Sequence, residues 1–353
     1  MNIPTLRDQP LLPLTTLTQW SGAFSHSVPG WQLHWDSTSY SAFCTCPKYY
    51  ELTYIQGITL RHRSVHLAFG IAWHSAMERF HRLRATGYDY DQALLWTIAE
   101  TYYRQLRTPE EKLQHQGFHE ESVPTGPLSH TPEKTPATLI QAIIQYLAYY
   151  KNDDLFTVIL PSGKAAVELS FAIELPTGDD DGAATYRGHL DRLVSKHKPL
   201  DFSQEKLPEK PWSFWASDYK TTTQALNERY FSQFTPDVQM TGYTLATKTM
   251  LPELGKGVVV DGVQMLVTGA RFGRSYITRS PTALTEFLTD LQTNIQVARY
   301  YAITGAWPMN RKACRREGRD CEFRFYCANP NSRQGILLSD FTRSRIWDPT
   351  KER

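Results

Sequence analysis

The 353-residue chain lacks several features that define common classes of protein. It has no apolar run long enough to span a bilayer, so we expect no contact with a membrane. It has no Gly-x-x-x-x-Gly-Lys-Ser/Thr motif, since Leu254-Gly255-Lys256-Gly257 does not fit it, and this excludes an ATP-driven helicase motor in the chain. Residues Met1 to Thr15 lack the apolar core of a secretory signal peptide, so we expect a cytoplasmic protein.

An excess of one charge is also missing. There are 38 lysines and arginines against 36 aspartates and glutamates, a net charge of +2. Any binding of nucleic acid would therefore depend on local basic patches rather than on overall attraction. The chain is 41% hydrophobic, which suffices for a large core, and its length suits one large α/β domain.

Cysteine is scarce, with five residues at two ends of the chain: Cys44 and Cys46, then Cys314, Cys321 and Cys327. An odd number in a chain without a signal peptide disfavours a disulfide framework. Structural zinc sites usually use tight Cys-x₂₋₄-Cys pairs, which the last three cysteines lack. Thiolates gathered from distant loops suit a [4Fe–4S] cluster. We favour iron–sulfur and keep zinc and free thiols as alternatives.

Two carboxylates and a lysine form the most informative pattern. Asp191 ends the segment Tyr186-Arg187-Gly188-His189-Leu190-Asp191, and Asp218-Tyr219-Lys220 follows downstream, both in strand-like sequence. Strand alternation puts Asp218 and Lys220 on one face and Tyr219 on the other. If the two strands are neighbours, both aspartates can share Mg²⁺ or Mn²⁺ for phosphodiester hydrolysis, with Lys220 beside the phosphate. A surface hairpin with the same residues is the alternative.

Residues 64 to 84 predict a helix, because Ala68, Ala72, Ala76 and Phe80 recur at helical spacing. His74 lies on another side of this helix, one turn after Gly70. A glycine there would let another backbone or a nucleic-acid strand approach closely. A structural, hydrogen-bonded histidine is the alternative to a metal ligand. Glu168, in a strand predicted over residues 164–174, is a lesser candidate for the metal shell.

These segments occur in the order found in one family. The chain resembles the PD-(D/E)XK nucleases, in particular the RecB-like and AddB-like iron–sulfur exonucleases and their CRISPR-associated and phage-encoded relatives. The matching pieces are Cys46-Pro47-Lys48-Tyr49, Gly70 to His74, Gly188-His189-Leu190-Asp191, Asp218-Tyr219-Lys220, Gln239-Met240-Thr241-Gly242-Tyr243, Trp307-Pro308-Met309-Asn310 and the last three cysteines.

The resemblance implies a restriction-endonuclease-like core, a central mixed β-sheet flanked by helices. We place this nuclease domain at residues 31–333, after a loose lead-in (1–30) and before a tail (334–353). The implied metal ligands are His74, Asp191 and Asp218. The implied catalytic residues are Asp191, Asp218, Lys220, Gln239 and Tyr243, the last two of which position the nucleotide backbone or the lysine.

The resemblance also implies that Cys46, Cys314, Cys321 and Cys327 bind a [4Fe–4S] cluster, which would pin the early helical region to the last helix. Related tails often have the first two of their three cysteines much closer together. Here Arg315 to Asp320 separate them, so Cys44 is an alternative ligand to Cys314. Two apart in an extended segment, Cys44 and Cys46 would point the same way.

The implied function is that of a Mg²⁺- or Mn²⁺-dependent DNA exonuclease acting on single-stranded ends in recombination, repair or phage DNA processing. The alternative is a non-catalytic iron–sulfur module that binds DNA ends beside a separate helicase. A helicase or recombination protein is thus an expected partner besides DNA. The polarity of digestion, the preference for single or double strands and the oligomeric state stay open at this level.

Overall fold

The computed structural model describes residues 22–60, 65–106, 131–160, 162–180, 182–196, 212–316, 319–343 and 348–350. From the sequence we also expect an inserted hairpin loop over residues 198–210 and a long loop over 108–136; the first and most of the second lie outside the described residues. The chain forms two compact units that alternate along the sequence. Of the described residues, those within 63–169 and 189–278 form unit 1, and those within 22–62, 170–188 and 279–350 form unit 2. The domain limits expected at residues 31 and 333 stay a prediction.

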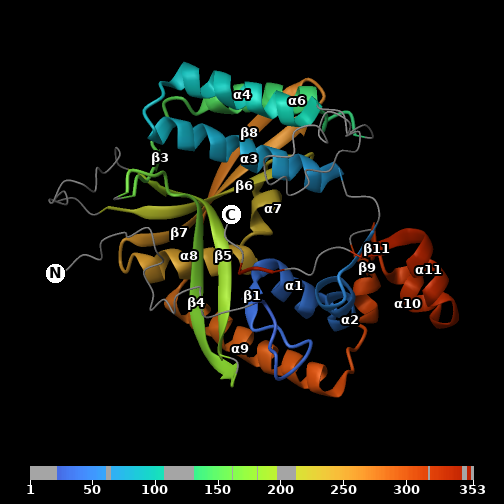
Figure 1. Cartoon of the computed structure of the whole chain (residues 1–353). Coiled ribbons are helices and arrows are strands. Elements are labelled where there is room, and N and C mark those ends of the chain that lie inside the picture. The colour runs from blue at the N-terminus through green and yellow to red at the C-terminus, as the bar shows by residue number, and fades with distance from the viewer. Residues whose placement is uncertain are drawn as a thin grey trace. The chain divides into compact units, whose positions relative to one another are not determined.

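A mixed β-sheet of seven strands confirms the central prediction of the fold (Figure 1). Its order is β1-β5-β6-β7-β8, and β3 and β4 also pair with β5. The β1–β5 and β6–β7 pairs are parallel, whereas β5–β6 and β7–β8 are antiparallel. The strands are β1 (His34–Asp36), β3 (Phe156–Thr157), β4 (Val167–Asp179), β5 (Gly182–Ser195), β6 (Phe214–Thr222), β7 (Gly255–Leu266) and β8 (Gly269–Thr278).

Helices of unit 1 cover both faces of its part of the sheet. On one face lie α3 (Val65–Ala85), α4 (Tyr90–Leu106) and α6 (Pro136–Tyr149), whose apolar side chains form one core with Tyr219, Val263 and Met265 of the strands. The other face carries α7 (Glu228–Ser232) and α8 (Val238–Met250). The sequence pattern predicts one helix over residues 230–249, but the structure has these two helices in its place. Pro236, which lacks an amide hydrogen, lies between them, and Asp237 caps α8 by accepting from the Met240 amide at 2.9 Å.

Unit 2 joins an early and a late segment of the chain. The early segment contains α1 (Ser37–Thr45), α2 (Pro47–Tyr50), the π-helical turn η2 (Glu51–Ile55) and β2 (Ile58–Leu60). The late segment contains α9 (Pro281–Thr304), η3 (Arg311–Cys314), β9 (Arg315–Arg316), β10 (Arg319–Asp320), α10 (Arg324–Ala328), η4 (Pro330–Ser332), α11 (Arg333–Asp340) and β11 (Phe341–Arg343). Antiparallel pairing of β11 with β2 links the two segments.

Aromatic side chains form the core of unit 2. Trp35 stacks on Tyr50 with ring centroids 5.3 Å apart, and Tyr50 stacks on Tyr54 at 5.6 Å. Trp307 from the late segment packs against Tyr50 at 5.5 Å. Such pairs stabilise the fold by about 0.5–1.5 kcal/mol each beyond the burial of their area. This core therefore fixes the segment around Cys46 against the chain that follows α9.

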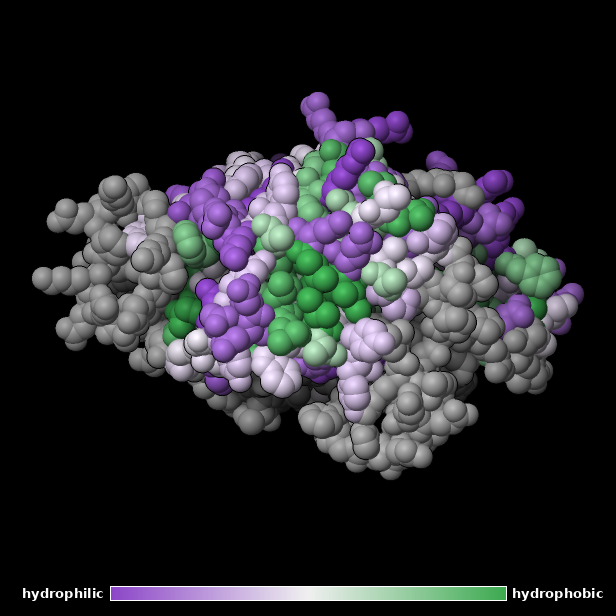
Figure 2. Space-filling view, turned by 90° about the horizontal axis from the view of Figure 1, so that it is seen from above, coloured by the Kyte–Doolittle hydropathy of each residue, from purple (hydrophilic) through white to green (hydrophobic). Residues whose placement is uncertain are grey.

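Two surface properties complete the description. None of the helices within the described residues has the length and apolar character needed to cross a membrane. Figure 2 shows an apolar patch on the face formed by α4 and α6, where Leu95, Trp96 and Ile144 are exposed.

Candidate functional sites

The register of β5 and β6 brings the two aspartates together. These neighbouring strands are antiparallel, and the pairing of Arg192 with Ser217 places Asp191 opposite Asp218. Residues directly opposite each other in such a pair lie on the same face of the sheet. The Asp218 side chain is fully buried and that of Asp191 is 11% exposed. The condition set by the sequence, that the two strands be neighbours, is fulfilled.

Lys220 connects this pair to helix α8. Its Nζ lies 2.8 Å from Asp218 Oδ2 and 3.1 Å from Oδ1, and it donates a hydrogen bond to Gln239 Oε1 at 2.8 Å. Gln239 Nε2 donates in turn to Tyr243 Oη at 2.9 Å. Gln239 and Tyr243 are four residues apart and share one helix face, as expected. Their contacts hold the lysine ammonium in place beside the Asp218 carboxylate.

His74 reaches the same place from α3. Its Nδ1 lies 3.1 Å from Asp191 Oδ2, and its Nε2 donates to the Tyr219 carbonyl at 3.0 Å. The Tyr219 amide donates to the same Asp191 oxygen at 3.0 Å. The residues predicted for the site from sequence are thus joined in one network within unit 1: His74, Asp191, Asp218, Lys220, Gln239 and Tyr243.

The charges in this network oppose one another. Burial alone would lower the pKa of His74, but the Asp191 carboxylate outweighs it and raises this pKa to about 9. Burial would likewise raise the pKa of Asp191, and the His74 imidazolium holds it below its usual value. For Asp218 burial dominates and raises the pKa to about 6; Asp191 adds to this rise, while Lys220 opposes it. Two carboxylates face each other with little water, an arrangement that a bound cation would relieve.

Glu168 joins the site through an unusual backbone conformation. Ligand atoms of His74, Glu168 and Asp191 all lie within 4.8 Å of one another. The φ angle of Glu168 is +50°, in the left-handed region that residues other than glycine seldom adopt within a strand. Such strain is typical of functional sites. From sequence, Glu168 is only a lesser candidate for the metal shell. The alternating pattern of a strand gives no indication that one of its residues adopts a positive φ.

The donor set fits a hard divalent cation. Three carboxylates (Glu168, Asp191 and Asp218) and one imidazole (His74) offer oxygen and nitrogen ligands of the kind that bind Mg²⁺ and Mn²⁺. The ligand atoms of His74, Glu168 and Asp191 lie within 4.8 Å of one another, and Asp218 is not in this group but forms an ion pair with Lys220. The protein can therefore hold a cation between α3 and the paired strands.

Tyr219 anchors the site from the opposite face, as strand alternation predicts. Its hydroxyl lies 3.1 Å from His81 Nε2, which also accepts from Arg192 Nη1 at 3.0 Å. Burial, followed by Arg192, holds the pKa of His81 well below its usual value, so this histidine is neutral. The sequence offered no signal for this support, because His81 and Arg192 form no motif with the aspartates.

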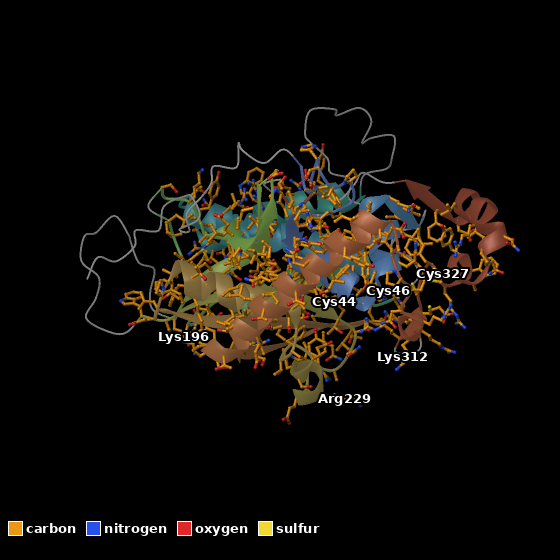
Figure 3. The ribbon with its side chains drawn as sticks, turned by 90° about the horizontal axis from the view of Figure 1, so that it is seen from below. Cys44, Cys46, Lys196, Arg229, Lys312 and Cys327 are labelled. Atoms are coloured by element: carbon orange, nitrogen blue, oxygen red, sulfur yellow. The ribbon has the colours of Figure 1, made fainter. Side chains whose placement is uncertain are left out.

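A second group of candidate ligands, the cysteines, lies in unit 2. Cys46, Cys314, Cys321 and Cys327 line one cavity of about 530 Å³, and Cys44 does not. Figure 3 shows Cys46 and Cys327 at the same end of this unit, with Lys312 close by. Asn310 ties the early cysteine to the late segment, since its amide donates to Cys46 Sγ at 3.3 Å and its side chain donates to the Thr45 carbonyl at 2.9 Å.

Between Cys314 and Cys321, the described residues on either side of positions 317–318 form a hairpin of two short antiparallel strands. Arg315 and Arg316 in β9 pair with Asp320 and Arg319 in β10. At the base of this hairpin the Cys321 amide donates to the Cys314 carbonyl at 2.9 Å. The long spacing therefore brings the two cysteines next to each other, and the reason for replacing Cys314 by Cys44 disappears.

Cys44 and Cys46 differ in conformation. The expectation of an extended segment is wrong at Cys44, which lies in the last turn of α1. The helix ends at Cys46, whose φ of −163° is extended. The change from helix to extended chain turns the two side chains in different directions, so only Cys46 lines the cavity.

The cysteine sulfurs are not packed tightly. Among the described residues, no three of the five thiols lie within 4.8 Å of one another. Zn–S bonds of about 2.3 Å would put the sulfurs of a tetrahedral zinc site about 3.8 Å apart. Burial raises the pKa of Cys321 and Cys327, and the other cavity cysteines add to the rise in both. The four thiols thus share one electrostatic environment at spacings wider than those of a zinc site.

The elevated pKa of His74 is directly testable in the metal-free protein. We expect the imidazole to titrate near pH 9, and Asp191→Asn to lower this pKa because burial then acts without the carboxylate. The pair stabilises the fold fully below the unfolded pKa of about 6.5, and this stabilisation is lost as pH rises through about 9. Histidine NMR titration measures the shift. Asp89→Asn, on the exposed turn after α3, is the control and should leave it unchanged.

Comparison with known proteins agrees with this geometry. A family model described as the PD-(D/E)XK nuclease superfamily matches residues 34–328, which includes both strands of the aspartate pair, helix α8 and all five cysteines. A comparison with curated proteins gives no match. The match spans most of the chain, and we conclude that the chain belongs to the PD-(D/E)XK nuclease superfamily.

Proposed function

We propose that this protein is a Mg²⁺- or Mn²⁺-dependent DNA exonuclease of the RecB-like, AddB-like iron–sulfur branch of its superfamily. The observation that carries the proposal is the placement of Asp191 opposite Asp218, with Lys220 fixed beside them and His74 in contact with Asp191. This arrangement supplies metal ligands and a cation on one face of two neighbouring strands. The proposed substrate is the end of a single DNA strand, in recombination, repair or phage DNA processing.

The roles follow from the contacts. His74, Glu168, Asp191 and Asp218 would hold the cation, which when bound polarises the phosphate and lowers the pKa of a water ligand. Lys220 orients the attacking water or stabilises the charge that develops on the phosphate. Gln239 accepts a hydrogen bond from Lys220, so it and Tyr243 position the lysine. His74 must lose the proton that Asp191 now favours before it can serve as a ligand.

A non-catalytic module that binds DNA ends beside a helicase is the competing function. Burying the two carboxylates and the lysine costs stability. A module that only binds DNA would not need these residues, nor the raised pKa of Asp218. The intact network therefore favours the enzyme. A separate helicase or recombination protein stays compatible with the proposal as a partner.

For the cysteine cavity we propose a [4Fe–4S] cluster bound by Cys46, Cys314, Cys321 and Cys327. The support is that these four line one cavity while Cys44 does not. A cubane bonds each thiolate to a different iron, so its sulfurs are spaced more widely than those around one zinc ion. No three of the described thiols lie within 4.8 Å of one another, so the proposal requires the wider spacing of a cubane. Because the ligands come from the two segments of unit 2, the cluster would have a structural role.

Removal of the central residues tests the enzyme. We expect Asp218→Ala and Lys220→Ala each to reduce cleavage by about 10²-fold or more, because each removes stabilisation of the transition state, while the fold is retained. The measurement is the product ladder from end-labelled single- and double-stranded DNA with Mn²⁺. Lys248→Ala, also on the α8 side of the structure, is a matched control and should cleave like the parent. Parent-like digestion by Asp218→Ala would refute the assignment.

The backbone of Glu168 allows a second test, in which metal binding and stability change in opposite directions. Glu168→Gly should weaken Mn²⁺ binding about 10-fold or more, yet raise Tm, because glycine adopts the φ of +50° without strain. Glu253, exposed and with a φ of +66°, is the matched control. Glu253→Gly should raise Tm and leave Mn²⁺ affinity unchanged. Electron paramagnetic resonance of free Mn²⁺ measures affinity without any assay of cleavage. Parent-like affinity in Glu168→Gly would remove Glu168 from the metal shell.

The cluster is tested by composition and colour. Anaerobically purified protein should be brown, with broad absorption near ~400 nm, and contain iron and sulfide. Cys321→Ser and Cys327→Ser should lose the colour and much of the soluble yield, whereas Cys44→Ser should retain both. A colourless parent with about one zinc and no iron would overturn the cluster. A brown Cys314→Ser with a colourless Cys44→Ser would show that Cys44 is the ligand.

A further inference from the structure

The first half of α3 exposes an apolar face next to the nuclease site. Leu67 is 57% exposed and Ile71 is 40% exposed, whereas Phe69 and Trp73 on the opposite side are fully buried. Leu67, Ile71 and His74 follow each other at intervals of four and three residues, so they share one helix face. We call the surface formed by Leu67, Gly70 and Ile71 the α3 shelf. It covers about two helical turns before His74.

Gly70 at the centre of the shelf has no structural requirement in the described part of the chain. Its φ is not in the left-handed region. A Cβ built on it would meet one atom within 4 Å, Thr221 Oγ1, at an ordinary contact distance of 4.0 Å. Gly262, in contrast, is packed, since a Cβ there would come within 2.8 Å of Leu226. Close approach of another protein backbone, one reason considered for a glycine at this position, is therefore wrong for the described residues.

A glycine in the middle of a 21-residue helix needs a reason, because only proline is less favourable there. The space in front of Gly70 adjoins Thr221, which directly follows Lys220 in β6. Along the helix, Gly70 is about 6 Å from His74 and Leu67 is about 10 Å from it. One or two nucleotides span this distance, so a strand whose phosphate lies at the carboxylates can lie across the shelf.

From these observations we propose that the α3 shelf binds the nucleotide adjacent to the scissile phosphate of a single-stranded DNA. The inference rests on the proposed nuclease function and adds how the strand is bound. The sugar–phosphate backbone passes over Gly70, where a side chain would obstruct it, and the base packs on Leu67 and Ile71. Base faces are free for such contact in a single strand, whereas in a duplex they are stacked on their neighbours.

The larger apolar patch on α4 and α6 (Figure 2) provides a comparison within unit 1. It includes Leu95, which is 67% exposed, more than either apolar residue of the shelf. The structure places neither a metal-ligand candidate nor a helical glycine among the exposed residues of that patch. Exposed apolar area alone therefore does not identify the shelf, and Leu95 is a suitable control for it.

The test separates stability from binding at Gly70. In a Lys220→Ala background without added Mn²⁺, which limits cleavage, we expect Gly70→Ala and Gly70→Leu to raise Tm, because both residues favour helix over glycine. The same variants should weaken binding of a fluorescein-labelled oligothymidylate, by roughly fivefold or more for Gly70→Leu. Fluorescence anisotropy gives Kd. Gly335→Ala on α11 is the matched control, because a Cβ there meets nothing, and it should raise Tm with unchanged Kd.

The second arm tests the base contact. Leu67→Gln with Ile71→Gln should weaken binding of the oligothymidylate but not of an oligonucleotide with abasic sites, and Leu95→Gln should affect neither. Parent-like Kd in Gly70→Leu, or equal loss for duplex and single strands, would overturn the shelf. If the unmodified chain cleaves no DNA with Mn²⁺, the proposed function itself fails. Cleavage by the unmodified chain with parent-like binding by Gly70→Leu refutes the shelf alone.

Discussion

The antiparallel pairing of β5 with β6 is the constraint on which the candidate metal site depends. A shift of one residue in this register would turn every side chain of one strand to the other face and separate Asp191 from Asp218. Tyr219 secures the register locally, because its amide binds the Asp191 carboxylate and its carbonyl accepts from His74. The backbone of Tyr219 thus links strand β6 to the Asp191 side chain of β5 and to the His74 side chain of α3.

Burial of so many charges is costly, and a second group of buried charges in unit 1 shows how pairing offsets this cost. On the Tyr219 side of the sheet, Arg274 pairs with Asp261 and lies 2.7 Å from Asp153, while Arg192 lies 3.8 Å from Asp261. This second ionic network is balanced internally. The carboxylates of the metal site are not balanced in the same way, since one lysine and one histidine face Glu168, Asp191 and Asp218. A bound divalent cation would neutralise this excess of negative charge, which agrees with the metal dependence proposed here.

The candidate ligands of unit 2 are held in place by apolar and aromatic packing, whereas those of unit 1 are held by ion pairs and hydrogen bonds. A small core that includes Leu52, Phe323 and Phe341, with Cys321 and Cys327 packed against it, places these cysteines at the edge of the cavity. Phe323 stacks on Phe341 with ring centroids 5.0 Å apart, and Tyr49 packs on Phe323 at 5.6 Å. Through the contact of Tyr49 with Phe323, the segment that contains Cys46 packs against the segment that contains Cys321 and Cys327. The proposed cluster would lock an arrangement that the aromatic core already favours.

The family resemblance carried by the sequence motifs implied the mixed sheet, its flanking helices and the candidate metal ligands. The sequence by itself determined the helix that carries His74 and the strands that carry the two aspartates, because alternation along strands and the 3.6-residue period of helices place side chains on known faces. It also placed Asp218 and Lys220 on one side and Tyr219 on the other. The tertiary structure alone decided three matters. Register and a left-handed backbone brought Glu168 to His74 and Asp191. Pairing of β9 with β10 brought Cys314 next to Cys321, and the end of α1 left Cys44 outside the cavity that the other four cysteines line. These outcomes depend on contacts between residues distant in sequence and on single φ angles, and local periodicity carries no information about either.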